Sequence, residues 1–166
     1  MDFALLLLRA VAGPVMAAHG AQKLFGWFGG HGIAGTAGFF EQLGFRPGRP
    51  FATAAALAEL VGGALIALGF LGPVGPAIVL ATMIVAVVSV HWPKGLFAQN
   101  GGYELPLVYA IIAVVLALTG PGAYSIDAAT GLASLWNESL VLVALVVGIV
   151  GGIVNLAARR STPVEG

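Results

Sequence analysis

Side chains that can transfer protons recur inside the apolar stretches of this chain. His19 and Lys23 lie four residues apart near the end of the first stretch, with Gln22 beside them. Glu59 lies near the middle of the second stretch and His91 near the end of the third. A histidine near a carboxyl group can hydrogen-bond or protonate a quinone-like head group, and the carboxyl group can relay the proton. We therefore predict His19, Glu59 and His91 as catalytic residues.

Glu59 is predicted to be protonated, hydrated or paired, because it lies roughly 3 Å from the membrane midplane at 1.5 Å of rise per residue. An ionised carboxylate at that depth costs about 2.5–3.5 kcal/mol to insert. Its candidate partners are Arg9 and His19, which differ from it in depth by roughly 9 Å and 6 Å. A purely structural interpretation is also open. Gly62 and Gly63 lie on the same helix face as Glu59, and this face can pack tightly against a neighbouring helix. The buried carboxyl group of Glu59 would then hold the two helices together.

Four further polar side chains are predicted to bind substrate: Gln22, Lys23, Tyr103 and Glu104. Lys23 and Glu104 would set the charge of the site, although Lys23 can instead extend its ammonium group to the membrane surface. Two histidines on different helices can also ligate a haem, but nothing else in the sequence supports that alternative. A His/Glu metal site has suitable ligand types without a spacing motif, so we predict no metal.

The composition excludes most classes of protein. The 166 residues are 59% hydrophobic and only 8% charged, with a mean hydropathy of +1.00. Ordinary soluble domains carry charge at about a quarter of their positions. Seven basic residues balance seven acidic ones, so no positive field attracts nucleic acid. The absence of cysteine excludes disulfides, thiol catalysis and cysteine-based metal centres. The chain is therefore predicted to be an integral membrane protein.

Five apolar segments are predicted to cross the membrane as helices, because about 20 apolar residues span the hydrocarbon layer. They cover residues 3–24, 51–71, 74–92, 105–119 and 140–158. The first is expected to be retained, since Asp2 and Arg9 are atypical of a signal peptide. The tryptophans Trp27, Trp92 and Trp136 lie at predicted helix ends, where an indole ring favours the headgroup boundary.

Two weaker patterns concern packing. Phe39, Phe40 and Leu43 fall on one helical face of the long connection between the first two segments. They predict either a short helix in the membrane interface or a turn packed on the bundle. Gly148 and Gly152 in the last segment form a small-xxx-small pair, suited to packing on the bundle or on a second copy.

The sequence contains an internal repeat. The run HGAQKLFG from His19 resembles the run HWPKGLF from His91, and a Gly-Pro pair follows the second and fourth segments alike. We predict two similar hairpins in parallel topology, related by an axis along the membrane normal. The predicted fold is an all-α membrane protein, with a four-helix transmembrane bundle of two repeated hairpins and a fifth C-terminal transmembrane helix.

Most polar side chains are predicted at one face of the membrane, because successive helices cross it in opposite directions. That face receives His19, Gln22, Lys23, His31, Glu41, Arg46, Arg49, His91, Lys94, Tyr103 and Glu104. The loops of the opposite face contain only Asp127 and Glu138 as charges. By the positive-inside rule, the polar face and the C-terminus are expected in the cytoplasm.

An ordered set of motifs resembles those of a known family. It consists of HGAQKLFG from His19, Glu59 with its two glycines, His91, GYE at 102–104, and GPG at 120–122 with SID at 125–127. These motifs resemble the DoxX family of bacterial membrane proteins over about residues 5–128. The resemblance implies a four-helix membrane core at 1–128. Residues 129–166 would form a connecting loop, the fifth transmembrane helix and a short polar tail.

The family takes its name from a small subunit of an archaeal thiosulfate:quinone oxidoreductase, and other members look like partners in membrane-associated redox or detoxification systems. We therefore expect a plasma-membrane component of a quinone-linked redox system, with a polar pocket at one end of the bundle. No electron carrier is visible, so such an enzyme would need a soluble redox partner subunit or a bound cofactor. Lipid surrounds the chain, self-association is open, and nucleic acid is not expected. The alternative is a non-enzymatic membrane scaffold or a small-solute carrier.

Overall fold

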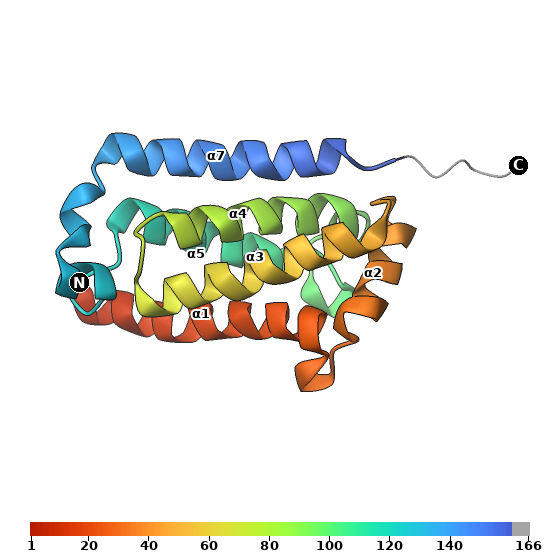
Figure 1. Cartoon of the computed structure of the whole chain (residues 1–166), viewed down its shortest axis with the longest axis horizontal. Helices are drawn as coiled ribbons and strands as arrows, with labels where there is room; N and C mark the ends of the chain where they lie inside the picture. The colour runs from red at the N-terminus through yellow and green to blue at the C-terminus, as the bar shows by residue number, and fades with distance from the viewer. Residues whose placement is uncertain (161–166) are drawn as a thin grey trace, which may run out of the picture.

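Five long helices lie side by side and alternate in direction in the computed structural model, which describes residues 1–160 (Figure 1). They are α1 (Asp2–Phe25), α3 (Gly48–Leu68), α4 (Val74–Ala86), α5 (Glu104–Thr119) and α7 (Glu138–Ala157). At one end of the bundle lie η1 (Trp27–Gly29) and α2 (Gly32–Gln42), and at the other α6 (Ile126–Thr130) and η5 (Leu132–Leu135). Residues 1–160 contain no β-strand, so the predicted all-α class is confirmed.

Four helical runs are long and apolar enough to cross a membrane. They are Asp2–Phe25, Gly48–Leu68, Val74–Lys94 and Glu138–Ala157. The fifth predicted segment forms α5, which is apolar but has only 16 residues. At 1.5 Å per residue α5 is about 24 Å long, somewhat less than the hydrocarbon layer. The protein is thus a multi-pass membrane protein.

Glycines bring α1 and α3 into backbone contact. A Cβ atom added to Gly20 of α1 would lie 2.4 Å from the backbone nitrogen of Leu60 in α3. One added to Gly63 of α3 would lie 2.4 Å from the nitrogen of Ala17. Small residues allow this approach between membrane helices, where van der Waals packing drives association. The contact sets the register in which residues near Gly20 face residues near Glu59.

The other glycines also pack closely, but the prediction that Gly62 and Gly63 share one packing face is wrong. Gly62 faces α4, where an added Cβ would lie 3.0 Å from a methyl carbon of Val79, so Gly62 and Gly63 serve two different neighbours. In α7, an added Cβ at Gly148 would lie 2.5 Å from the carbonyl oxygen of Ala77, and Gly152 approaches α4 one turn further on. The Gly148–Gly152 pair therefore packs on the bundle.

The long connection between α1 and α3 contains the predicted short helix, which extends further than the pattern indicated. Phe40 of α2 is buried and clusters with Phe45 and Ala52, whereas Phe39 is 43% exposed. The hydroxyl group of Thr36 donates hydrogen bonds to the carbonyl oxygens of Lys23 and Gly32. α2 is thereby attached to the end of α1.

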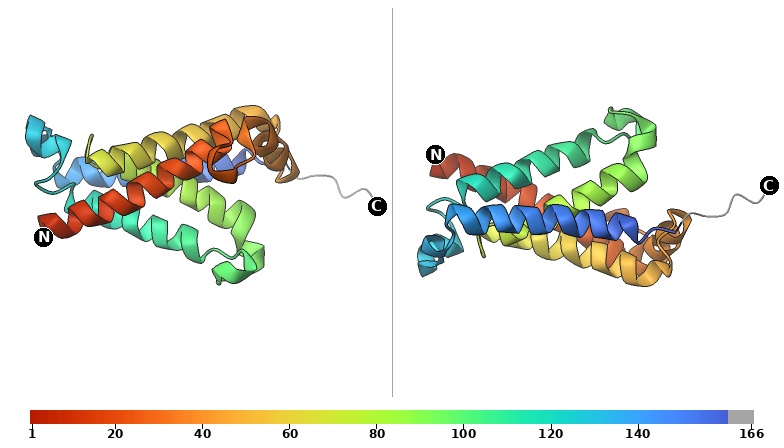
Figure 2. Two further views of the ribbon diagram at one scale, coloured as in Figure 1. Left: turned by 90° about the horizontal axis from the view of Figure 1, so that it is seen from below. Right: turned by 90° about the horizontal axis from the view of Figure 1, so that it is seen from above.

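The connection between α4 and α5 diverges from the rest of the bundle at the same end. It consists of the π-helical turn η2 (Val87–His91) and the short turns η3 (Trp92–Lys94) and η4 (Ala98–Asn100). Figure 2 shows this connection displaced sideways from α2 and the start of α3. The first helices of the two predicted hairpins therefore end differently. His19 lies in the regular α-helix α1, whereas His91 lies in the π-helical turn η2.

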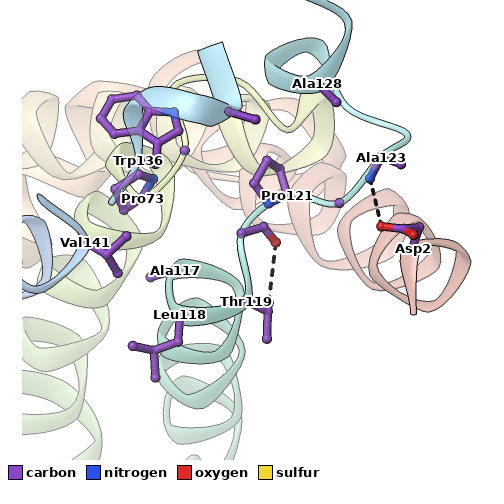
Figure 3. Close-up of a pocket in the computed structure, with 14 residues that line it drawn as sticks. Asp2, Pro73, Ala117, Leu118, Thr119, Pro121, Ala123, Ala128, Trp136 and Val141 are labelled. Atoms are coloured by element: carbon purple, nitrogen blue, oxygen red, sulfur yellow. Dashed lines mark hydrogen bonds between the residues drawn. The ribbon is translucent and has the colours of Figure 1, made fainter. Parts of the chain in front are cut away.

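At the opposite end, Asp127 ties the α6 segment to the turn between α3 and α4. Its carboxylate is fully buried and accepts hydrogen bonds from the backbone N–H groups of Leu71 and Gly72 and from the indole N–H of Trp136. A hollow of about 440 Å³ lies beside this contact and is lined by Trp136, Pro73 and the turn after α5 (Figure 3). Trp136 is therefore half-buried against protein, whereas Trp27 and Trp92 are 59% and 64% exposed at the polar end.

Candidate functional site

An apolar cavity of about 390 Å³ lies in the half of the bundle nearest the polar end, between α2, α3, α4 and α7. Alanine, valine, isoleucine and phenylalanine side chains make up most of its wall. Three of the residues predicted from the sequence line it: Lys23, Glu59 and His91. These three come from α1, α3 and the turn η2, so the tertiary structure brings together side chains from three separate segments.

Lys23 and Glu59 form an ion pair inside the bundle. The side chain of Glu59 is 8% exposed and that of Lys23 is 29% exposed. Lys23 therefore directs its ammonium group inward to the carboxylate, and its predicted extension to the membrane surface is wrong. The pair is neutral overall, which reduces the cost of placing a carboxylate in the apolar interior.

The two predicted partners of Glu59 lie elsewhere. Arg9 is 2% exposed and donates hydrogen bonds to the carbonyl oxygens of Ala67 and Tyr124. Ala67 belongs to the last turn of α3, where carbonyl groups lack helical partners and favour a positive charge. The expected Arg9–Glu59 and His19–Glu59 contacts are therefore wrong, because the C-terminal end of α3 takes Arg9 and Lys23 takes Glu59.

His91 lines the cavity with one ring nitrogen already bonded. Its Nδ1 lies 2.6 Å from the carbonyl oxygen of Gly101, which can only accept a hydrogen bond. Nδ1 therefore carries the proton, and in the neutral ring Nε2 is left as an acceptor. The π-helical turn that positions His91 is a feature frequently found at functional sites.

His19 does not line the cavity and is exposed. Its Nδ1 lies 3.1 Å from the amide oxygen of Gln22, whose amide nitrogen donates to the carbonyl oxygen of Phe28. His19 and Gln22 thus belong to a polar contact at the start of the turn after α1. The structure does not bring His19 and His91 into one cavity.

Tyr103 and Glu104 shape the α4–α5 connection and do not line the cavity. The Tyr103 ring stacks on Trp92 with ring centroids 5.3 Å apart. The Glu104 carboxylate accepts a hydrogen bond of 2.8 Å from the backbone N–H of Ala98. Both side chains therefore stabilise the α4–α5 connection, which contains His91.

α7 forms part of the cavity wall, although none of its residues was predicted at the site. Asn155 lines the cavity, together with Gly151 and Gly152 of the same helix. Asn155 is the one polar residue in the apolar segment 140–158. A single polar residue in such a segment could have been recognised as a candidate site residue from the sequence. Thr82 and Ser89 also line the cavity, but each donates its hydroxyl proton to a carbonyl oxygen of its own helix.

Within residues 1–160, no three histidine or acidic side chains are grouped so as to hold a metal ion. At the cavity, the side chains of Lys23, Glu59 and His91 are groups that can donate and accept protons. Apolar walls around these groups strengthen their electrostatic interactions with a bound molecule. The arrangement fits a ligand with an apolar ring and a few polar oxygen atoms.

Comparison with known proteins agrees with this picture of a membrane protein. The Bacillus subtilis (strain 168) protein named "Putative oxidoreductase CatD" is 30% identical over 122 residues, which are 74% of this chain and 83% of that protein. No solved structure matches the chain. The family model described as DoxX matches residues 4–92, a range that includes Lys23, Glu59 and His91. The chain therefore belongs to the DoxX family.

Proposed function

We propose that this protein is the membrane component of a quinone-linked redox system and that it binds a quinone head group in the apolar cavity. The observation that carries the proposal is the half-buried Lys23–Glu59 ion pair at the wall of a cavity that His91 also lines. The cavity volume of about 390 Å³ falls within the range of about 300–1,000 Å³ typical of small-molecule sites.

The three side chains have complementary roles in this proposal. The ammonium group of Lys23 donates a hydrogen bond to a quinone oxygen and attracts the negative charge that forms there on reduction. The Nε2 atom of neutral His91 accepts a hydrogen bond from the hydroxyl group of the reduced form. Glu59 holds or releases the proton that the reduction requires. We assign the head-group contacts to these residues and not to His19, Gln22, Tyr103 or Glu104, because only the former line the cavity.

Electrons would come from a soluble partner subunit or a bound cofactor. The residues of the cavity offer acids and bases but no side chain that carries electrons, so the chain acts with a donor protein or a bound cofactor. The name of the Bacillus subtilis relative supports an oxidoreductase role. The partner would dock on the polar end, near which the cavity lies.

We also propose how the chain sits in the bacterial plasma membrane. α5 crosses as a fifth transmembrane helix, with the turns at its ends completing the span. Residues 1–128 form the family core, and the remainder adds α7 and a tail, of which residues 161–166 lie outside the described part. The basic residues at the polar end place that end in the cytoplasm by the positive-inside rule.

The test is to purify the protein in mild detergent, extract it with organic solvent and quantify the co-purified quinone. We expect close to one quinone per chain in the wild type and at least a tenfold loss in Glu59→Gln. Glu138→Gln, a carboxyl-to-amide change at the exposed start of α7, is the matched control and should retain the quinone. Quinone-free wild-type protein that also fails to bind added quinone would refute the proposal. Solute flux in proteoliposomes would then favour a carrier, and a co-purified protein without bound quinone would favour a scaffold.

A further inference from the structure

A second hollow, of about 320 Å³, lies on the polar end of the molecule beside the apolar cavity. Its wall comes from the end of α1, the glycine-rich turn after it and α2. It has a larger share of polar lining than the apolar cavity, with the side chains of Gln22, His31 and Thr36 beside glycines and two phenylalanines, and it is open to the surface.

The two hollows share a wall made of Lys23, Phe39 and Phe40. The two phenylalanine rings are apolar, so Lys23 is the polar side chain of this shared wall. Its ammonium group bonds to the carboxylate of Glu59, which lines only the apolar cavity. Lys23 therefore connects a polar space at the surface with a carboxylate buried in the bundle.

Other polar groups at the apolar cavity do not provide the same connection. Thr82 and Ser89 donate to carbonyl oxygens of their own helix. His91 approaches the cavity from η2 and is bonded through Nδ1 to Gly101. None of these three lines the polar hollow, whose titratable groups are Lys23 and His31.

We propose that the polar hollow is a hydrated vestibule and that Lys23 passes protons between its water and Glu59. In one transfer, an N–H bond of the Lys23 ammonium group breaks as an O–H bond forms on Glu59. The neutral amine then takes a proton from a water molecule in the vestibule and leaves a hydroxide ion, which bulk water neutralises, so one proton has moved inward and no electron has moved. This inference rests on the proposed function for its purpose, because reduction of a quinone takes up protons, but the route itself can be tested without quinone.

The chain has no native cysteine, so single-cysteine variants test the hydration of each hollow directly. The exposed residue His31 lines the vestibule, and the partly buried residue Ala58 lines the apolar cavity. With a charged, membrane-impermeant thiosulfonate reagent, we expect His31→Cys to react at least tenfold faster than Ala58→Cys. Equal reaction rates of the two cysteine variants would contradict the proposal that the vestibule is hydrated and the apolar cavity is not.

Proton transfer is tested by a rapid drop in pH, with the protonation of Glu59 followed by the infrared carboxyl band that Glu59→Gln removes. We expect Lys23→Met to slow this protonation at least tenfold. Lys94→Met, which changes the chain's other lysine, should leave it unchanged, since Lys94 is exposed and lines neither hollow. Modified His31→Cys leaves Lys23 and Glu59 unsubstituted but fills the vestibule, so it should also slow protonation.

The outcomes separate the two proposals. Unchanged protonation rates in both Lys23→Met and modified His31→Cys would overturn the proton route, whether or not quinone binds. Slowed protonation in a protein that binds no quinone would support the route and refute the quinone site.

Discussion

Gly20 of α1 lies in direct contact with the backbone of Leu60 in α3, so closely that a Cβ atom added to Gly20 would approach the Leu60 nitrogen to 2.4 Å. This contact sets the distance between the two helices at the level of the candidate site. Leu60 adjoins Glu59, and Lys23 follows Gly20 by about one helical turn. The side chain of Lys23 can reach Glu59 because the two backbones are this close.

Gly20→Val is therefore expected to separate α1 from α3 and to destabilise the protein. Overpacking of this kind typically costs about 1–3 kcal/mol, and here the obstructing atoms belong to the backbone and cannot rotate away. Thermal unfolding in detergent measures the effect. Gly151→Ala is the matched control within a membrane helix, because an added Cβ there meets nothing within 4 Å. An unchanged unfolding temperature in Gly20→Val would contradict the close helix contact.

Loss of one member of the Lys23–Glu59 pair should destabilise the protein more than loss of both. Breaking a fully buried ion pair costs about 3–5 kcal/mol, and we expect less here because the Lys23 side chain is 29% exposed. In Lys23→Met the buried carboxylate loses its partner, whereas Lys23→Met with Glu59→Gln leaves no charge to compensate. A double-mutant cycle of unfolding free energies checks this, and strictly additive effects would show that the two residues do not interact.

The two histidines are expected to differ in their effect on quinone binding. His91→Ala removes a ring from the cavity wall and should lower quinone affinity by at least fivefold. His19→Ala should change it less than twofold, because the His19 ring lies outside the cavity and bonds to Gln22. Titration of quinone-free protein with a short-chain ubiquinone measures both. The reverse order of effects would place the head group on the His19 side of α1.

Asp127→Ala is expected to loosen the end of the bundle opposite the candidate site. Its carboxylate accepts three hydrogen bonds in the structure, and each bond to a charged group contributes about 1.5–3 kcal/mol. Trp136→Phe removes only the indole donor and should cost less than Asp127→Ala. Unfolding temperatures of the two variants test this order. Because the contact is remote from the cavity, quinone content per folded chain should stay close to that of the wild type in both.

The sequence was sufficient for the features that depend on local composition. Long apolar runs predict membrane helices, because the hydrocarbon layer demands that backbone groups be satisfied within each segment. The residues Lys23, Glu59 and His91 were recognisable as candidates, because polar side chains are rare in such runs. Asn155 of α7 carried the same signal and was overlooked.

Only the tertiary structure decided which of these side chains meet. His19 and Lys23 are four residues apart on α1, yet Lys23 reaches Glu59 and His19 does not. Depth along a helix can be counted from the sequence, but the rotation of a helix about its axis is set by its contacts with neighbours, such as that of Gly20 with Leu60. The same holds for Arg9, which binds the end of α3 because the turn carrying Tyr124 folds over it.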